Sequence, residues 1–334
     1  MNNNKISLTG IKPTGIPHIG NYFGAIKPAL ELVNDYNPFY FIADYHALNI
    51  IKNKQDMKKL CYNLAATWLA CGLDPEKVVF YKQSMVPETF ELEVILSAFT
   101  PKGLMNRAHA YKAKVDSNKN SGKDPDDGVN IGLFTYPVLM AADILLFDTD
   151  LVPVGKDQVQ HIEMATDIAQ SINYNYQKDL FKIPKPLIQK ETQLVIGLDG
   201  RKMSKSYNNV IPLFLPENQL RKLIMRIVTN SQTVEEPKNP DESNIFSLYK
   251  LFATPEEIED LKNQYLKGGM GWGYAKNILF EKINSHFKPM REKYNELISD
   301  KKYIDKILLE GSEKARYIAS KKMRKLRRAL GVTN

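Results

Sequence analysis

Two lysines and two serines stand within five residues in the segment Lys202-Met203-Ser204-Lys205-Ser206. Gly197 and Gly200 precede this segment, so we expect it to lie on a flexible loop. Ammonium and hydroxyl groups on such a loop can close over a polyphosphate and stabilise charge that develops during phosphoryl or nucleotidyl transfer. A solvated basic loop without this role is the alternative that the segment by itself leaves open.

A second segment, Thr9 to Asn21 (TGIKPTGIPHIGN), lies between a predicted first strand and a predicted first helix. An α/β sheet places its ligand crevice at such a junction. His18 stands where the helix is expected to begin, beside free backbone N–H groups that favour phosphate. Gly20 would leave room for a flat ring to lie against the backbone. A Gly/Pro turn that is capped by a histidine also occurs in α/β folds without any such function.

A third group of residues comes from the segment 136–143 (YPVLMAAD), where Tyr136, Met140 and Asp143 would share one face of a helix. An ionised carboxylate beside an apolar side chain suits a ring with a single N–H donor, as indole has, whereas a phenol both donates and accepts. The alternatives are simple core packing of Met140 and a capped or solvent-paired Asp143.

The elements that must position these residues alternate between strands and helices up to about residue 210, which predicts an α/β fold with a Rossmann-like parallel sheet. Beyond residue 210 the strand signals vanish, and we expect an all-α C-terminal domain over 211–334 after a catalytic domain over 1–210. A mobile loop is expected at 116–128, which contains no large apolar residue. The expected strands are 5–8, 39–43, 77–81, 151–154 and 193–196, and the expected helices are 19–33, 55–71, 88–98, 131–147 and 158–172.

Composition excludes several classes of protein. A chain of 334 residues with 43% hydrophobic residues is typical of a globular protein. The apolar run 136–147 is too short to span a bilayer, and no apolar signal region follows Met1, so we expect a cytoplasmic protein without a membrane segment. Two cysteines are too few for a structural zinc site and fit a reducing compartment. Residues 301–334 hold eleven basic and three acidic residues, which accounts for the whole net charge of +8.

The two loop segments together resemble the signatures of class I aminoacyl-tRNA synthetases. PTGIPHIGN at 13–21 is similar to the HIGH signature, and KMSKS is intact at 202–206. The resemblance covers nearly the whole chain and is closest to the bacterial tryptophanyl-tRNA synthetase family. It implies that L-tryptophan reacts with ATP to give tryptophanyl-adenylate and pyrophosphate, before transfer to tRNA(Trp). It also implies a homodimer, with Mg²⁺ on the triphosphate and no metal held by the protein.

The resemblance further implies roles for individual residues. It assigns catalytic roles to His18, Lys202 and Lys205. The residues implied in ATP binding are Lys12, Pro13, Thr14, Gly20, Asn21, Gly155, Lys156, Asp157, Val195, Lys202, Met203, Ser204, Lys205 and Ser206. Those implied in tryptophan binding are Asp143, Met140, Tyr136, Gln158 and His46. Lys12 departs from the glutamine of many bacterial relatives, and we hypothesise that it contacts phosphate or carboxylate directly.

Three other functions compete with this one. Tyrosyl-tRNA synthetases share the fold and both signatures, but they typically have glutamine where Met140 stands. A small-molecule nucleotidylyltransferase would not need the helical C-terminal region, and an inactive relative that binds RNA would not need His18 and both lysines.

In the basic last helix, Met323, Leu326 and Leu330 should face the core and leave the cations outward, either solvated or in contact with tRNA.

Overall fold

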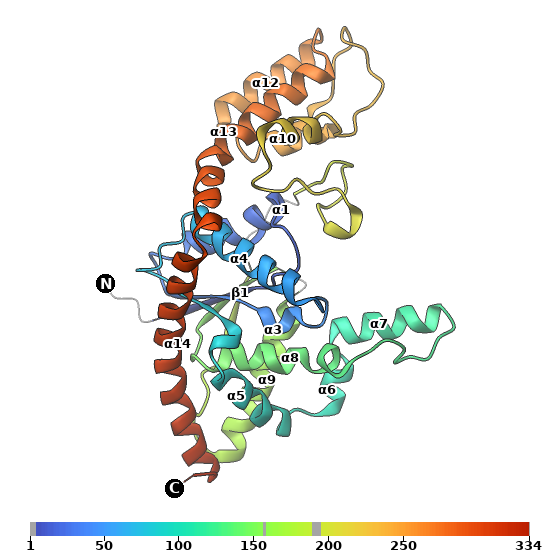
Figure 1. The fold of residues 1–334 in the computed structure, drawn as a ribbon. Helices are drawn as coiled ribbons and strands as arrows, with labels where there is room; N and C mark the ends of the chain where they lie inside the picture. The colour runs from blue at the N-terminus through green and yellow to red at the C-terminus, as the bar shows by residue number, and fades with distance from the viewer. Residues whose placement is uncertain (1–4, 156–157, 189–194, 334) are drawn as a thin grey trace.

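The computed structural model describes residues 5–155, 158–188 and 195–333 and has a parallel five-stranded sheet at its centre (Figure 1). The strand order is β3-β2-β1-β4-β5, as in a Rossmann-like fold, which confirms the predicted fold class. All pairings are parallel, with Leu8 opposite Phe39 and Phe41 opposite Tyr81. The strands are β1 (Ile6–Ile11), β2 (Asn37–Ile42), β3 (Val79–Lys82), β4 (Leu151–Val154) and β5 (Lys185–Ile188).

Helices cover both faces of this sheet, so strand β2 is buried on both sides. Phe39 and Phe41 pack toward α5, α8 and α9, whereas Tyr40 and Ile42 pack toward the first helix and α4. The helices of this part are α1 (Ile19–Asn21), α2 (Lys27–Glu31), α3 (Asp44–Ala47), α4 (Lys54–Ala70), α5 (Glu88–Ala98), α6 (Lys102–Asn106), α7 (His109–Asn120), α8 (Ile131–Leu145) and α9 (Val159–Tyr176).

The predicted first helix is interrupted in the middle. A π-helical segment, η1 (Tyr22–Ile26), joins α1 to α2. Pro28, near the start of α2, has no N–H to donate to the preceding turn, and the wider π turn accommodates that missing bond.

The fifth strand was not among the expected ones. Strand β5 (Lys185–Ile188) contains Pro186, a residue type that is rare inside strands, but β5 lies at the edge of the sheet, where a proline is tolerated. The strand expected at 193–196 lies mostly outside the described residues. Ile196 forms only an isolated bridge with Lys202.

The loop expected at 116–128 is wrong over residues 116–120, which form the last part of helix α7. The remainder folds back onto that helix, because the buried Asn118 donates through Nδ2 to the carbonyl oxygens of Pro125 and Asp127. Tyr111 also donates to the Asp126 carboxylate over 2.8 Å. The segment lacks a hydrophobic core, but local side-chain bonds order it.

The C-terminal helices form two groups rather than one (Figure 1). Most lie together above the sheet: α10 (Glu217–Ile224), α11 (Asn244–Tyr249), α12 (Pro255–Lys267) and the first part of α13 (Trp272–Ser299). Helix α14 (Lys301–Leu330) instead runs down along edge strand β3. A side-chain carbon at Gly311 would lie 1.8 Å from the carbonyl oxygen of Phe80, so only glycine allows this approach. Both hydrophobic clusters also include residues from before and after residue 210.

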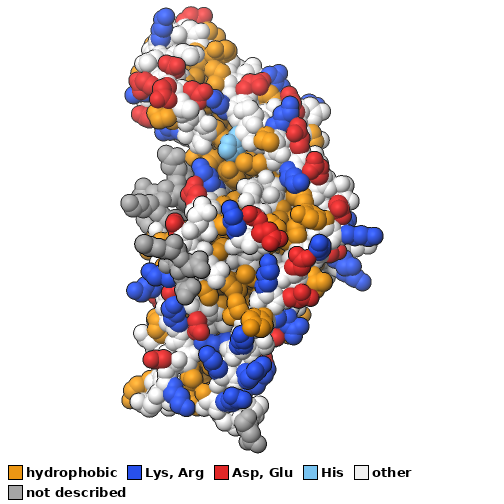
Figure 2. All heavy atoms as spheres, turned by 90° about the vertical axis from the view of Figure 1, so that its left-hand side faces the viewer, with side chains coloured by type: hydrophobic (Ala, Val, Ile, Leu, Met, Phe, Trp, Pro, Cys, Tyr) orange, Lys and Arg blue, Asp and Glu red, His pale blue; other side chains and the backbone are white. Residues whose placement is uncertain are grey.

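The basic end of α14 is less free than its sequence suggested. Met323 and Leu326 are buried as expected, and Leu330 is half-buried. Two of the cations turn inward, which the sequence analysis did not expect: Lys322 pairs with Asp148, and Arg327 forms a two-pronged pair with Glu91. Lys and Arg side chains gather at the lower end of one face of the molecule (Figure 2). On α14, Lys321, Arg324, Lys325 and Arg328 are exposed.

Within the described residues, no helix is both long and apolar enough to cross a membrane.

Candidate active site

A crevice opens where strands β1, β2 and β4 end, at the edge of the sheet where parallel α/β folds bind ligands. It consists of an inner cavity of about 120 Å³ and an outer cavity of about 390 Å³. The two cavities share six lining residues and are therefore continuous. These are Leu8, Gly10, Lys12, Met140, Val152 and Gln158.

The inner cavity has a carboxylate in its wall. Asp143, on helix α8, is 2% exposed and lies 2.9 Å from Nε2 of His46 through its Oδ2. Gln83 donates through its own Nε2 to both oxygens of Asp143, over 2.9 Å each. Burial raises the pKa of Asp143, while the hydrogen bonds from His46 and Gln83 oppose that rise. The carboxylate thus has protein donors in place before any ligand arrives.

The remaining walls of the inner cavity are mainly apolar. Met140 lies one turn before Asp143 on α8, and Phe41 and Ile144 line the same space. Tyr136 also lines it and is hydrogen-bonded through its hydroxyl to Nε2 of the buried His161. The structure therefore brings together all five residues that the resemblance assigned to tryptophan, namely Asp143, Met140, Tyr136, Gln158 and His46.

The outer cavity is bordered by ammonium groups. Lys12 stands where the two cavities meet, exposed to the water of the cleft, and partial burial lowers its pKa. Lys205 reaches across the cavity mouth, and its Nζ would lie 2.9 Å from a side-chain carbon at Gly15. Burial also lowers the pKa of Lys205. The described lining residues include no carboxylate, so this end of the crevice is suited to an anion. Of the residues assigned to ATP, Lys12, Thr14, Asn21, Gly155 and Lys205 line it.

His18 lies behind this cavity and is buried. Its backbone N–H donates to Oδ1 of Asn21 over 3.1 Å at the start of the first helix. The segment 211–213 pairs with the backbone around His18: Ile19 donates to the carbonyl of Ile211, and Leu213 donates to that of Pro17. Burial, together with the Lys205 ammonium, lowers the pKa of His18 to about 4, so its imidazole is neutral at pH 7.

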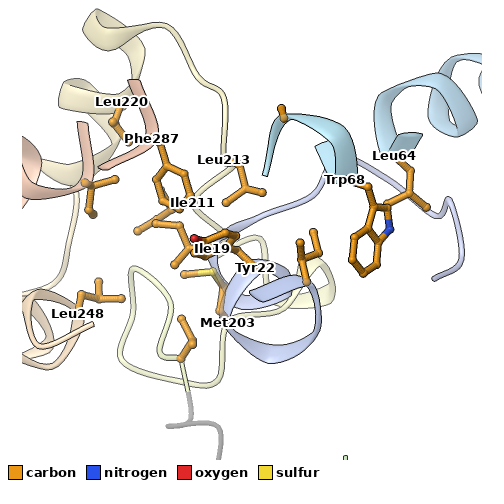
Figure 3. Packing of buried hydrophobic residues seen from close by; sticks show 14 of the residues in the cluster. Ile19, Tyr22, Leu64, Trp68, Met203, Ile211, Leu213, Leu220, Leu248 and Phe287 are labelled. Carbon is orange, nitrogen blue, oxygen red and sulfur yellow. The ribbon is translucent and has the colours of Figure 1, made fainter. Parts of the chain in front are cut away.

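The loop that carries Lys205 is fixed by a buried asparagine. Asn209 accepts from the backbone N–H of Ser204 over 2.8 Å and donates to the Asp199 carboxylate over 2.7 Å. Met203 anchors the loop on its other side. Its sulfur accepts from the N–H of Gly20, and its side chain packs beside Ile19 (Figure 3).

The other described residues that were assigned to ATP do not line the outer cavity. Lys202 and Ser206 are exposed on the loop, and Ser204 is half-buried, with its hydroxyl 2.8 Å from that of Ser206. The carbonyl of Val195 accepts from the backbone of Met203 over 2.8 Å. Pro13 is buried, and Gly20 is half-buried under the loop. Lys156 and Asp157 lie outside the described residues.

Sequence reasoning missed three parts of the site: Gln83, Asn209 and the segment 211–213. Gln83 follows strand β3, so it stands at the same edge of the sheet as the known motifs. That position after a strand was the only signal available. Asn209 and the segment 211–213 directly follow the KMSKS segment, but nothing in their residue types pointed to a binding role.

Comparisons with known proteins identify the family of the chain. A family model described as "tRNA synthetases class I (W and Y)" matches residues 1–288. The chain is 52% identical to the tryptophan–tRNA ligase of Bordetella parapertussis over 328 residues, which are 97% of this chain and 72% of that protein. Identity to the tryptophan–tRNA ligase of Neisseria meningitidis is 48% over 328 residues, with 97% of each chain covered.

A solved structure shows the same likeness. The tryptophanyl-tRNA synthetase of Campylobacter jejuni, which was crystallised with ADP and tryptophan, matches with a TM-score of 0.91 at 46% identity. The match covers 98% of this chain and 99% of that one. Since the family model spans most of the chain, and the relatives are about half identical over nearly all of it, the chain belongs to the class I aminoacyl-tRNA synthetases, in the family of tryptophan–tRNA ligases.

Proposed function

We propose that this chain activates L-tryptophan with ATP and then transfers it to tRNA(Trp). The observation that carries the proposal is the single crevice that joins a buried carboxylate in an apolar wall to a lysine-bordered cavity. Such a crevice suits an indole at its inner end and a triphosphate at its outer end, with Lys12 where the two would meet.

The first step requires positioning and charge stabilisation but no general base, because a carboxylate is already ionised at neutral pH. An oxygen of the tryptophan carboxylate attacks the α-phosphorus of ATP, the bond to the β-phosphate oxygen breaks, and pyrophosphate leaves. Lys205 and Lys202 would stabilise the charge on the triphosphate. His18 and Asn21 would hold the nucleotide from the first helix.

Mg²⁺ would come with the triphosphate rather than bind to the protein. The described residues around the outer cavity carry no carboxylate, and the described parts of the chain contain no cluster of His, Cys, Asp and Glu that could hold a metal ion. We therefore assign the charge stabilisation in the site to the lysines.

Indole is preferred to phenol because of what surrounds Asp143. A carboxylate only accepts hydrogen bonds and Met140 offers no donor, so a phenol oxygen would lack one of its partners. An unsatisfied buried hydroxyl costs about 1–3 kcal/mol, which is enough for useful discrimination.

Pyrophosphate exchange with tryptophan and tyrosine in parallel tests the proposal. We expect exchange that depends on tryptophan and is at least about tenfold weaker with tyrosine. Exchange without any amino acid would indicate a different nucleotidyl transfer, and no exchange at all would indicate an inactive relative.

We assign tRNA binding to the helical region above the sheet, with a further contact at the basic end of α14. The support for that contact is charge: Lys321, Arg324, Lys325 and Arg328 are exposed cations on one end of a helix. Changing all four to Gln should lower the slope of tRNA affinity against salt concentration by about two to four and spare adenylate formation. Lys302→Gln, at the other end of α14, is the control, and an unchanged slope contradicts the contact.

The unpaired thiols of Cys61 and Cys71 agree with a cytoplasmic location.

A homodimer would cover an exposed apolar surface beside the inner cavity. Its residues are Tyr45, Leu48, Ile50, Val94 and Ile131. They are neighbours, since the rings of Tyr45 and Phe90 are 4.5 Å apart and Gly132 lies against the side chain of Asn49. We infer that a second copy of the chain packs there. Light scattering should give a dimer for the parent chain and for Leu266→Asp, but a monomer for Val94→Asp/Ile131→Asp. A dimer of that double variant contradicts this surface.

A further inference from the structure

A closed polar network lies behind the inner cavity, and one of its members has no contact with the cavity itself. Gln83 is fully buried on η2 (Gln83–Met85), the short helical turn after strand β3, and does not line the crevice. It nevertheless donates to both oxygens of Asp143, over 2.9 Å each. Its own amide oxygen lies 3.4 Å from the backbone N–H of His46. Since the ring of His46 contacts Asp143 as well, the three residues form a closed circuit.

The donors of this circuit occupy most of the hydrogen-bond acceptor positions of the Asp143 carboxylate. An ionised carboxylate has about four acceptor positions, two on each oxygen. Gln83 takes one position on each oxygen, and the His46 ring takes a second one on Oδ2. Among the described residues, no further donor reaches Oδ1. A single acceptor position is therefore left for a ligand, and it lies on a carboxylate that lines the cavity.

The bridge to both oxygens also fixes the plane of the carboxylate. The terminal torsion of an aspartate is soft, so a carboxylate held by one oxygen can turn about it. Gln83 holds both oxygens at equal distances, and it is fully buried, as is Tyr81, two residues before it on β3. The direction of the remaining acceptor position is thus set by a residue that the ligand does not touch.

We propose that Gln83 is the positioning residue of the indole site. By holding Asp143 ionised and in one orientation, it reserves one acceptor for the N–H of the tryptophan ring. This inference rests on the role of Asp143 proposed above, and it adds that the preference for an N–H comes from the pair rather than from Asp143 alone.

The test compares tryptophan with its sulfur isostere, β-(3-benzothienyl)alanine, which has nearly the same shape but no ring N–H. The ratio of the two kcat/KM values in pyrophosphate exchange isolates the N–H contact. In Gln83→Met, which keeps the length of the side chain but cannot donate, we expect kcat/KM for tryptophan to fall about tenfold through KM. The value for the isostere should change less than about twofold. The ratio of tryptophan to isostere then falls by at least about fivefold.

Two further variants keep the outcomes distinct. Ser84→Ala lies on the same turn and leaves the backbone bond from Ser84 to Asp44 in place, so it should keep the parental ratio. Asp143→Asn tests the proposed site itself: if that variant retains the parental ratio, the assignment of Asp143 to the indole is wrong. If Asp143→Asn lowers the ratio and Gln83→Met does not, only the role of Gln83 is refuted. Equal losses for both substrates in Gln83→Met would show a merely structural role and would likewise refute it.

Discussion

At the inner end of the crevice Asp143 is enclosed by donors that belong to the protein, whereas at the outer end Lys12 and Lys205 have no carboxylate of the described residues within ion-pair distance. The inner cavity is thus complete before the ligand arrives. The outer cavity keeps an unbalanced positive charge that only an anion can compensate.

This difference suggests a division of tasks between the two ends. A preorganised buried network discriminates between ligands, because a wrong ligand leaves its groups unpaired. Ammonium groups on a loop stabilise charge that appears during the reaction, and they need to move with the phosphates. Changes at the inner end should therefore act on amino acid recognition, and changes at the outer end on the rate of adenylate formation.

The largest expected effect is that of Asp143→Ala at the inner end. It removes the acceptor and leaves the donors of Gln83 and His46 unpaired in a buried site. We expect kcat/KM for tryptophan to fall at least about a hundredfold, with the KM for ATP within about twofold of the parent. Pyrophosphate exchange at varied tryptophan and ATP measures both. If the KM for ATP changed as strongly as kcat/KM for tryptophan, the proposed division between the two ends would be wrong.

Lys205→Ala at the outer end should give the next largest effect. We expect adenylate formation to slow at least about tenfold, with little loss of tryptophan affinity, because the ammonium acts on the triphosphate. Single-turnover kinetics and equilibrium tryptophan binding separate the two quantities. Unchanged pyrophosphate exchange in this variant would overturn the mechanism. Lys202→Ala is the matched comparison for Lys205→Ala, because Lys202 lies on the same loop but is exposed and does not line the cavity.

Lys12→Gln tests the point where the two ends meet. Because Lys12 lines both cavities, we expect moderate increases of about three- to tenfold in the KM of ATP, tryptophan or both. The same exchange assay measures them. The hypothesis of a direct contact is wrong if both KM values and kcat stay unchanged.

The smallest effect concerns stability and depends on pH. The pKa of His18 is lowered to about 4 from an ordinary value of 6.5, so the unfolded chain binds this proton more readily than the folded one. The contribution is fully present above pH 6.5 and is lost as the pH falls toward 4. We expect urea unfolding to show a loss of stability between pH 7 and 4.5 that is about 2 kcal/mol larger in the parent than in His18→Gln. Equal losses in both proteins would contradict a buried neutral His18.

Local patterns were sufficient for the alternation of strands and helices and for the position of both signature loops. Helix α5 and strand β4 have the predicted bounds, because their apolar spacing reflects burial on one face or on both. Strand β5 and helix α7 escaped prediction for local reasons. A proline at a sheet edge and a helix ordered by the Asn118 side chain contradict the usual composition rules.

The sequence by itself determined the family, the α/β alternation and the residue types proposed to meet ATP and tryptophan, since these depend on short motifs and periodicity. Only the tertiary structure decided which groups act in pairs. Gln83 and Asp143 are 60 residues apart. Lys322 and Asp148 are 174 apart. Periodicity reports which face of an element is buried, but it carries no information on which buried polar group of another element it will meet there. For that reason the motifs located the site, and the packing of the sheet edge determined its specificity network.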